Sequence, residues 1–204
     1  MQKDIHFWFT TLIRGFIALL AGTGILVIPD MARTILLLPL AIAFAVVSLA
    51  AYGILDSTII FVSSYMVESR RTRLALRLQG TVGVIAGGLL LFVVADRVQL
   101  IWFLSLAALQ ALGVAAGEFI VARHEPRHSI SIWNYAGAAV AACFGTLYLV
   151  VRFAYVEHLT YRDVSWLIYG YLVAFGIAQC LTASRVIYAD YRVVDSKHGN
   201  PSGA

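Results

Sequence analysis

The chain has 204 residues, of which 61% are hydrophobic and only 13% are charged, and its formal net charge is +4. A soluble domain carries about 25% charged residues, so this chain lacks the charge to cover a water-exposed surface. The composition excludes an ordinary soluble globular protein and predicts that lipid solvates much of the surface. The basic residues cluster between apolar segments, as topology signals do, so no nucleic-acid partner is predicted.

Six apolar segments of membrane-spanning length follow one another along the chain. A span needs about 20 apolar residues. The segments cover approximately residues 7–28, 34–61, 76–95, 98–121, 132–151 and 164–188. They are continuous, whereas the strands of a membrane barrel are about ten residues long and alternate in polarity. The sequence therefore predicts an all-α fold, an integral membrane bundle of six transmembrane helices.

The connections between these segments alternate in character. The first segment is predicted to stop at a tight turn, Pro29 to Arg33, and a second tight turn follows at Asp96 and Arg97. The connections Glu68 to Arg77 and Arg123 to Ser129 are longer and basic, and a long loop covers residues 151–163. This alternation groups the six helices into three helical hairpins.

The distribution of lysine and arginine predicts the orientation in the membrane. Ten of these residues lie on one predicted side and four on the other, if Arg14 is counted as embedded in the membrane. The first group comprises Lys3, Arg70, Arg71, Arg73, Arg77, Arg123, Arg127, Arg185, Arg192 and Lys197, and the second comprises Arg33, Arg97, Arg152 and Arg162. Because basic loops stay in the cytoplasm, both termini are predicted to be cytoplasmic.

The three hairpins resemble one another, which predicts an internal repeat within a single domain. Gly15 and Gly22 recur 65 positions later as Gly80 and Gly87. Small residues at such positions allow helices to approach closely in lipid. The repeats cover about residues 5–66, 73–124 and 130–190. They form one six-helix membrane domain, residues 1–195, followed by a disordered cytoplasmic tail, residues 196–204.

The first hairpin carries the motif W-x5-R-G-x6-G, formed by Trp8, Arg14, Gly15 and Gly22, with Pro29 at the predicted turn. Weaker copies start near Gly80 and Trp133. With these motifs, about residues 5–190 resemble the HdeD-type acid-resistance membrane proteins, a short-repeat family. The resemblance implies a non-enzymatic bacterial inner-membrane protein that acts in stress or acid tolerance, and it supplies no catalytic residues. The second hairpin departs from the pattern, since Asp96 replaces the turn proline.

Polar side chains inside the predicted spans are the candidates for function, because charges in the membrane interior are costly. Arg14 and Asp56 are predicted to lie at one level of neighbouring helices. The repeat aligns Gln79 with Arg14, and it aligns Glu118 and Gln179 with Asp56. These residues form the candidate intramembrane polar cluster: Arg14, Asp56, Gln79, Glu118 and Gln179.

The cluster admits a structural and a functional interpretation. In the structural one, Arg14 extends to the lipid headgroups with Asp56 as its partner, and Glu118 pairs with Arg123 or Arg77. In the functional one, the cluster binds protons or a small solute. Two other functions remain open, a small-solute or proton transporter with a path lined by Asp56, Glu118 and Gln179, and an accessory subunit of a larger membrane complex.

The remaining predictions concern partners and cofactors. Arg70, Arg71 and Arg73 are predicted to contact anionic lipid headgroups. A homo-oligomer or another membrane protein is a further partner left open. His124 and His128 are four residues apart, but Pro126 interrupts the helix that would align them, so no metal site is predicted. No motif for a cofactor or for catalysis occurs.

Overall fold

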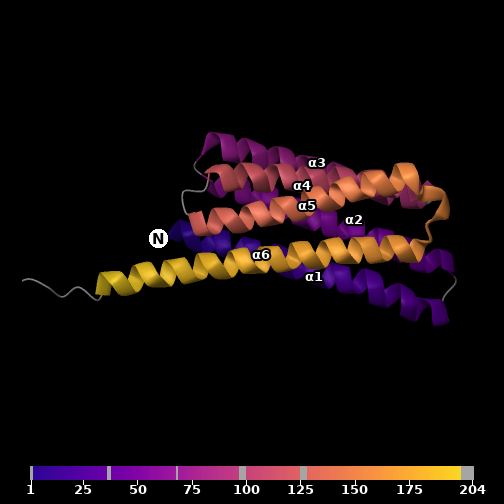
Figure 1. Ribbon diagram of the computed structural model, residues 1–204, viewed down its shortest axis with the longest axis horizontal. Coiled ribbons are helices and arrows are strands. Elements are labelled where there is room, and N and C mark those ends of the chain that lie inside the picture. Colours follow the sequence, from indigo (N-terminus) through magenta and orange to yellow (C-terminus); the bar gives the residue numbers. More distant parts are fainter. Residues whose placement is uncertain (1, 36–37, 68, 97–99, 125–127, 199–204) are drawn as a thin grey trace, which may run out of the picture.

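The structure is a computed structural model that describes residues 2–35, 38–67, 69–96, 100–124 and 128–198 (Figure 1). Side chains are described within residues 9–27, 46–67, 69–92, 101–124, 130–155, 157–160 and 162–188, so those of Trp8 and Pro29 lie outside the description. The long helices are α1 Gln2–Ile35, α2 Leu38–Ser63, α3 Arg70–Asp96, α4 Leu100–His124, α5 His128–Ala154 and α6 Tyr161–His198. Two short 3₁₀ turns, Ser64–Met66 and Val156–His158, complete the described elements, which include no strand.

Each of the six helices is long and apolar enough to span a membrane. This confirms the predicted all-α class and indicates a multi-pass membrane protein. The spans satisfy their own backbone hydrogen bonds, as any segment crossing lipid must. The start of α1 and the end of α6 lie at the same end of the bundle (Figure 1).

Three predicted boundaries differ from the structure. The tight turn at Pro29 to Arg33 is wrong, because α1 continues through these residues to Ile35. Proline is tolerated inside membrane helices, where neighbouring groups can satisfy the carbonyl that it leaves free. The predicted connection from Glu68 to Arg77 is helical from Arg70 onward, since arginine and leucine are good helix formers. At the other end of the chain, α6 extends to His198, past the predicted start of the tail, and residues 199–204 lie outside the description.

The loop predicted over residues 151–163 is also shorter than expected, because α5 continues to Ala154 and α6 begins at Tyr161. Thr160 and Asp163 fix the start of α6. The Asp163 carboxylate accepts hydrogen bonds from the Thr160 backbone N–H at 2.9 Å and from its hydroxyl at 2.6 Å. The Asp163 N–H in turn lies 3.4 Å from the Thr160 hydroxyl oxygen. This reciprocal pair is a capping box, which satisfies backbone donors at the first turn of a helix.

The six helices close into a ring. Each helix packs against its neighbours in sequence, and α6 returns to pack against α1. The most extensive contacts join α4 to α5, α1 to α6 and α2 to α3. These pairs join one predicted hairpin to the next, so the helices pack more closely between the predicted hairpins than within them.

Glycines explain which helix pairs pack most closely. A Cβ atom on Gly15 of α1 would lie 2.9 Å from the carbonyl oxygen of Gly176 in α6. One on Gly80 of α3 would lie 2.8 Å from the carbonyl oxygen of Ser57 in α2, and one on Gly145 of α5 would be equally close to a leucine of α4. Because lipid supplies no hydrophobic force between helices, such backbone approach is what holds them together. The internal repeat itself remains a prediction.

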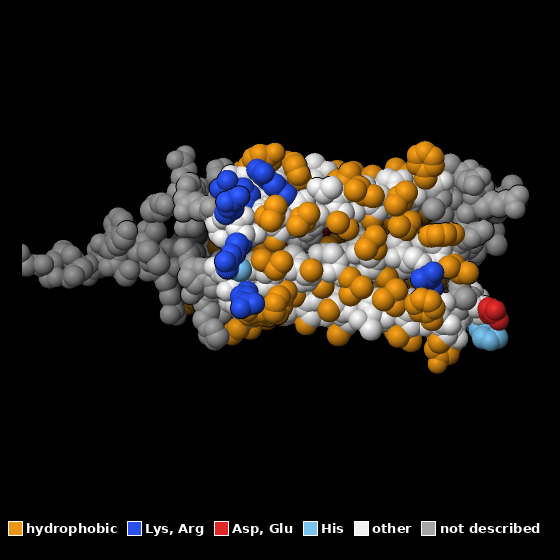
Figure 2. Space-filling model, turned by 90° about the horizontal axis from the view of Figure 1, so that it is seen from above, with side chains coloured by type: hydrophobic (Ala, Val, Ile, Leu, Met, Phe, Trp, Pro, Cys, Tyr) orange, Lys and Arg blue, Asp and Glu red, His pale blue; other side chains and the backbone are white. Residues whose placement is uncertain are grey.

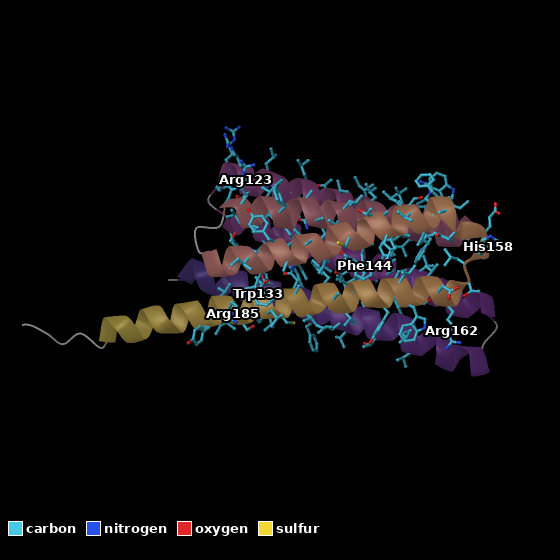
Figure 3. All side chains as sticks on the ribbon, in the orientation of Figure 1. Arg123, Trp133, Phe144, His158, Arg162 and Arg185 are labelled. Atoms are coloured by element: carbon cyan, nitrogen blue, oxygen red, sulfur yellow. The ribbon has the colours of Figure 1, made fainter. Side chains whose placement is uncertain are left out.

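The outer surface of the bundle is apolar around its middle and basic at one end (Figure 2). Large side chains such as Phe16, Phe92 and Phe153 are more than half exposed, as expected for residues that face lipid. Arg123 and Arg185 lie at the end where α1 begins, and His158 and Arg162 lie at the opposite end (Figure 3). Several polar side chains, among them Arg14, Asp56 and Glu118, are buried inside the ring.

Candidate functional site

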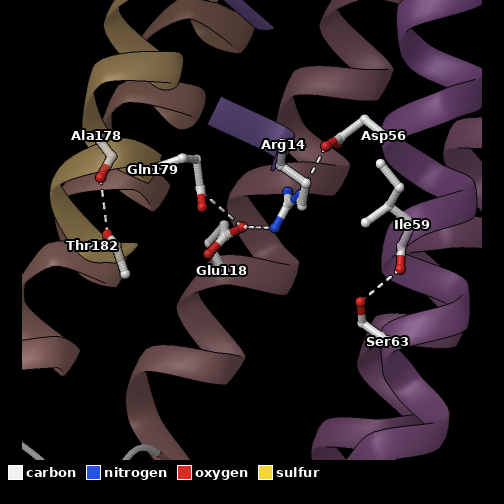
Figure 4. Close-up of polar contacts among 8 residues, drawn as sticks. All are labelled: Arg14, Asp56, Ile59, Ser63, Glu118, Ala178, Gln179 and Thr182. Carbon is white, nitrogen blue, oxygen red and sulfur yellow. Dashed lines mark hydrogen bonds and ion pairs between the residues drawn. The ribbon is translucent and has the colours of Figure 1, made fainter. Parts of the chain in front are cut away.

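Arg14 lies inside the ring and pairs with two carboxylates from different helices. Its Nε donates a hydrogen bond to Asp56 Oδ1 of α2 at 2.7 Å, and its Nη1 donates to Glu118 Oε1 of α4 at 2.8 Å (Figure 4). The exposed fractions of Arg14, Asp56 and Glu118 are 8%, 1% and 5%. One guanidinium therefore links three helices in a buried ionic cluster.

Gln179 of α6 extends this cluster to a fourth helix. Its Nε2 donates to Glu118 Oε1 at 3.1 Å, so this oxygen accepts from both Gln179 and Arg14. Hydrogen bonds to an ionised acceptor are stronger than neutral ones, which favours this arrangement in a dry interior. The structure thus brings together four of the five predicted cluster residues: Arg14, Asp56, Glu118 and Gln179.

Gln79, the fifth predicted member, is buried on α3 but does not join the hydrogen bonds of the cluster. Its amide packs against the backbone at Gly117 of α4, where any side chain on the glycine would overlap it. Neither amide atom of Gln79 has a hydrogen-bond partner among the described residues. Gln79 therefore lies beside Gly117, the residue that precedes Glu118, but it forms no hydrogen bond with the Glu118 carboxylate.

The structural interpretation is correct in pairing Arg14 with Asp56, but its other contacts differ from those observed. Arg14 is buried, and Glu118 pairs with Arg14 rather than with Arg77 or Arg123. Arg77 instead stacks on Tyr65, with its guanidinium carbon 4.6 Å from the ring centroid. Among the described residues, Arg14 is the cation that pairs with both carboxylates.

Aromatic residues that the sequence did not single out surround the cluster on one side. The guanidinium carbon of Arg14 lies 5.7 Å from the ring centroid of Phe175. The buried phenols of Tyr52 and Tyr171 lie within electrostatic range of Arg14, Asp56 and Glu118. Tyr52 precedes Asp56 by one helical turn, and this spacing is the signal that would have placed both on one face.

A small polar cavity adjoins the cluster on the side of the basic end. Its volume is about 30 Å³, and all six helices contribute lining residues, including Arg14, Glu118 and Gln179. By this measure a water molecule needs roughly 10–15 Å³, so the cavity has room for about two. The Nη2 of Arg14 and the Nδ2 of Asn134, which also lines the cavity, are buried donors without an acceptor among the described residues. Water that enters would accept hydrogen bonds from both.

Known proteins give no further guide to this site. No protein-family model, curated protein or solved structure matches the chain. Among the described residues, no group of three or more histidine, cysteine or acidic side chains is arranged to bind a metal ion.

Proposed function

We propose that this chain is a non-enzymatic proton-binding protein of the bacterial inner membrane, similar to the HdeD type, that acts in acid or stress tolerance. The observation that carries the proposal is the charge of the buried cluster. Arg14 supplies one positive charge, whereas Asp56 and Glu118 supply two negative charges when both are ionised. The link to acid or stress tolerance comes from the sequence resemblance.

The excess negative charge makes proton binding favourable. An uncompensated buried charge costs several kcal/mol even after the protein relaxes. One proton shared by the two carboxylates would leave the cluster neutral, with one carboxylate ionised against Arg14. The other titratable groups that face the cluster are the phenols of Tyr52 and Tyr171. Gln179 and Asn134 contribute only uncharged amide groups. Among the described residues, no second cation therefore offsets the extra negative charge of the cluster.

The size of the cavity favours a proton over a transported solute. Pockets that hold small molecules have volumes of about 300–1,000 Å³, whereas the cavity beside the cluster has about 30 Å³. A proton needs no additional space, and one or two water molecules suffice to deliver it. Glu118 lines this cavity and Asp56 does not, so we expect the proton to reach the cluster at Glu118.

Infrared difference spectroscopy on the purified protein in lipid tests the proposal. We expect the wild type to show the C=O stretching band of a protonated carboxylic acid. Both Glu118→Gln and Asp56→Asn should lose this band, because each leaves Arg14 balanced by a single ionised carboxylate. In cells, both variants should express normally but lose acid survival.

Glu157→Gln is the matched control, because Glu157 is an exposed carboxylate in the turn between α5 and α6. It should keep both the band and the survival of the wild type. A wild-type spectrum without a band that depends on Asp56 or Glu118 would contradict the proposal. So would a band that persists in Asp56→Asn, since the charge of the cluster would then not govern the proton.

We also propose that both termini face the cytoplasm. The support is that Arg70, Arg71, Arg73, Arg77, Arg123 and Arg185 belong to the end of the bundle where α1 begins. Among the other arginines at the two ends of the bundle whose side chains are described, only Arg152 and Arg162 belong to the opposite end. A reporter enzyme that is active only in the cytoplasm should therefore work when fused to the C-terminus. The same reporter inserted after Glu157 should be inactive, and the opposite result would reverse the orientation.

A further inference from the structure

A groove lined by three arginines runs along the first two turns of α3. Its volume is about 430 Å³, and its described lining residues are Arg70, Arg73, Leu74 and Arg77. These positions are three or four residues apart, so their side chains share one face of the helix. Arg70 and Arg73 belong to the set predicted to contact lipid headgroups, Arg71 of that set does not line the groove, and Arg77 is an addition to it.

Two of the three guanidinium groups are held in place by the preceding segment. Arg73 donates to the carbonyl oxygen of Val67 through Nε at 3.1 Å and through Nη2 at 2.8 Å. Arg77 lies over the ring of Tyr65, and its Nε is 3.4 Å from the Ser64 hydroxyl oxygen. Neither Arg70 nor Arg77 forms an ion pair with a described carboxylate. Two of the three guanidinium groups beside the groove are therefore held in fixed positions.

An apolar stripe continues from this groove toward the middle of the bundle. Leu74, Leu78 and Ile85 follow one another along α3, and the side chain of each is more than half exposed. Their spacing of about one or two helical turns keeps them on the side of the helix that also carries Arg70 and Arg77. A molecule that covered both the groove and the apolar stripe would need an anionic end and a long apolar end.

We propose that this surface binds one anionic phospholipid of the bilayer. The phosphate would accept hydrogen bonds from Arg70 and Arg77, because guanidinium groups bind phosphate oxygens in a bidentate manner. An acyl chain would lie along Leu74, Leu78 and Ile85. A free phosphate ion would leave the apolar stripe unused, and a zwitterionic lipid would bring a fourth positive charge into a groove that already has three. This site is separate from the ionic cluster and does not depend on its function.

Native mass spectrometry of the purified protein tests this site with phosphatidylglycerol as the probe. The variant Arg70→Gln/Arg77→Gln removes two of the charges and keeps Arg73, which binds the Val67 carbonyl. Its affinity for phosphatidylglycerol should fall about 25-fold, since each arginine near an anionic headgroup contributes roughly a fivefold factor. Binding of phosphatidylcholine should be weaker than that of phosphatidylglycerol in the wild type and should change little in the variant.

The matched control is Arg71→Gln/Arg123→Gln, which removes the same charge from exposed arginines outside the groove. It should retain binding within about twofold, because separated surface charges are largely screened. Arg70→Gln alone, at an exposed position with no described partner, provides a second test if the double variant does not fold. Equal losses in the two double variants would overturn the proposal, and so would displacement of the lipid by inorganic phosphate alone.

Discussion

Replacing Arg14 with methionine should destabilise the folded protein by about 3–5 kcal/mol, because both carboxylates would remain buried without a cation. This loss is large against a typical total stability of about 5–15 kcal/mol. Size-exclusion chromatography after mild extraction should therefore show little monodisperse protein at neutral pH. Lowering the pH should recover part of the folded fraction, because a proton would neutralise the carboxylate that Arg14 no longer balances.

The variant Arg14→Met/Asp56→Asn/Glu118→Gln separates charge from packing. It removes all three ionisable groups while nearly keeping their volumes, and replacing a buried ion cluster as a whole is often neutral for stability. We expect it to fold better than Arg14→Met and to show no recovery at low pH. If the triple variant were as unstable as the single one, the loss would come from packing around Arg14 rather than from the two carboxylates.

The spans and the level of the cluster could be predicted from the sequence because both depend on local pattern. A run of about 20 apolar residues is sufficient to identify a membrane helix. The turn from which Arg14 and Asp56 are counted is displaced, since α1 continues to Ile35, but the alignment of Asp56, Glu118 and Gln179 brings α2, α4 and α6 to the same level. The structure confirms that these four side chains meet.

The sequence could not predict which side chains at this depth contact one another. The depth of a residue in the bundle does not determine how its helix is rotated about its own axis. Gln79 has the depth of Arg14 in the alignment, yet its amide packs against Gly117 and not against a carboxylate. The sequence also allows Glu118 a surface partner, Arg77 or Arg123. Which partner it meets depends on how α1 and α4 face each other across the ring, and that is set by glycine contacts between distant segments.

The glycine contacts and the ionic cluster depend on each other through α2. Gly80 packs against the backbone of Ser57, the residue that follows Asp56. A displacement of α2 at this point would therefore move the Asp56 carboxylate, whose hydrogen bond to Arg14 Nε is 2.7 Å long. Charge-assisted bonds of this kind weaken steeply with poor geometry. Close packing of α2 on α3 thus positions one half of the ion pair.

Replacing Gly80 with alanine should destabilise the bundle, whereas the same change at Gly88 on the same helix should not. At Gly80 the new Cβ would lie 2.8 Å from the Ser57 carbonyl oxygen and 2.9 Å from Phe61 Cβ, and at Gly88 no other residue's atom lies within 4 Å. Overpacking costs about 1–3 kcal/mol, and alanine in a helix gains about 1 kcal/mol over glycine. Thermal unfolding followed by tryptophan fluorescence should place Gly80→Ala below the wild type and Gly88→Ala at or above it.

The same two variants connect packing to the proposed proton site. Because Gly80→Ala would push Ser57 and the adjacent Asp56 away from α3, it should also weaken the infrared band of the protonated carboxyl, although no ionisable residue is changed. Gly88→Ala should leave that band intact. Equal stability and equal spectra in the two variants would mean that the approach of α3 to α2 at Gly80 does not position Asp56, and that Arg14 and Glu118 hold the cluster together without it.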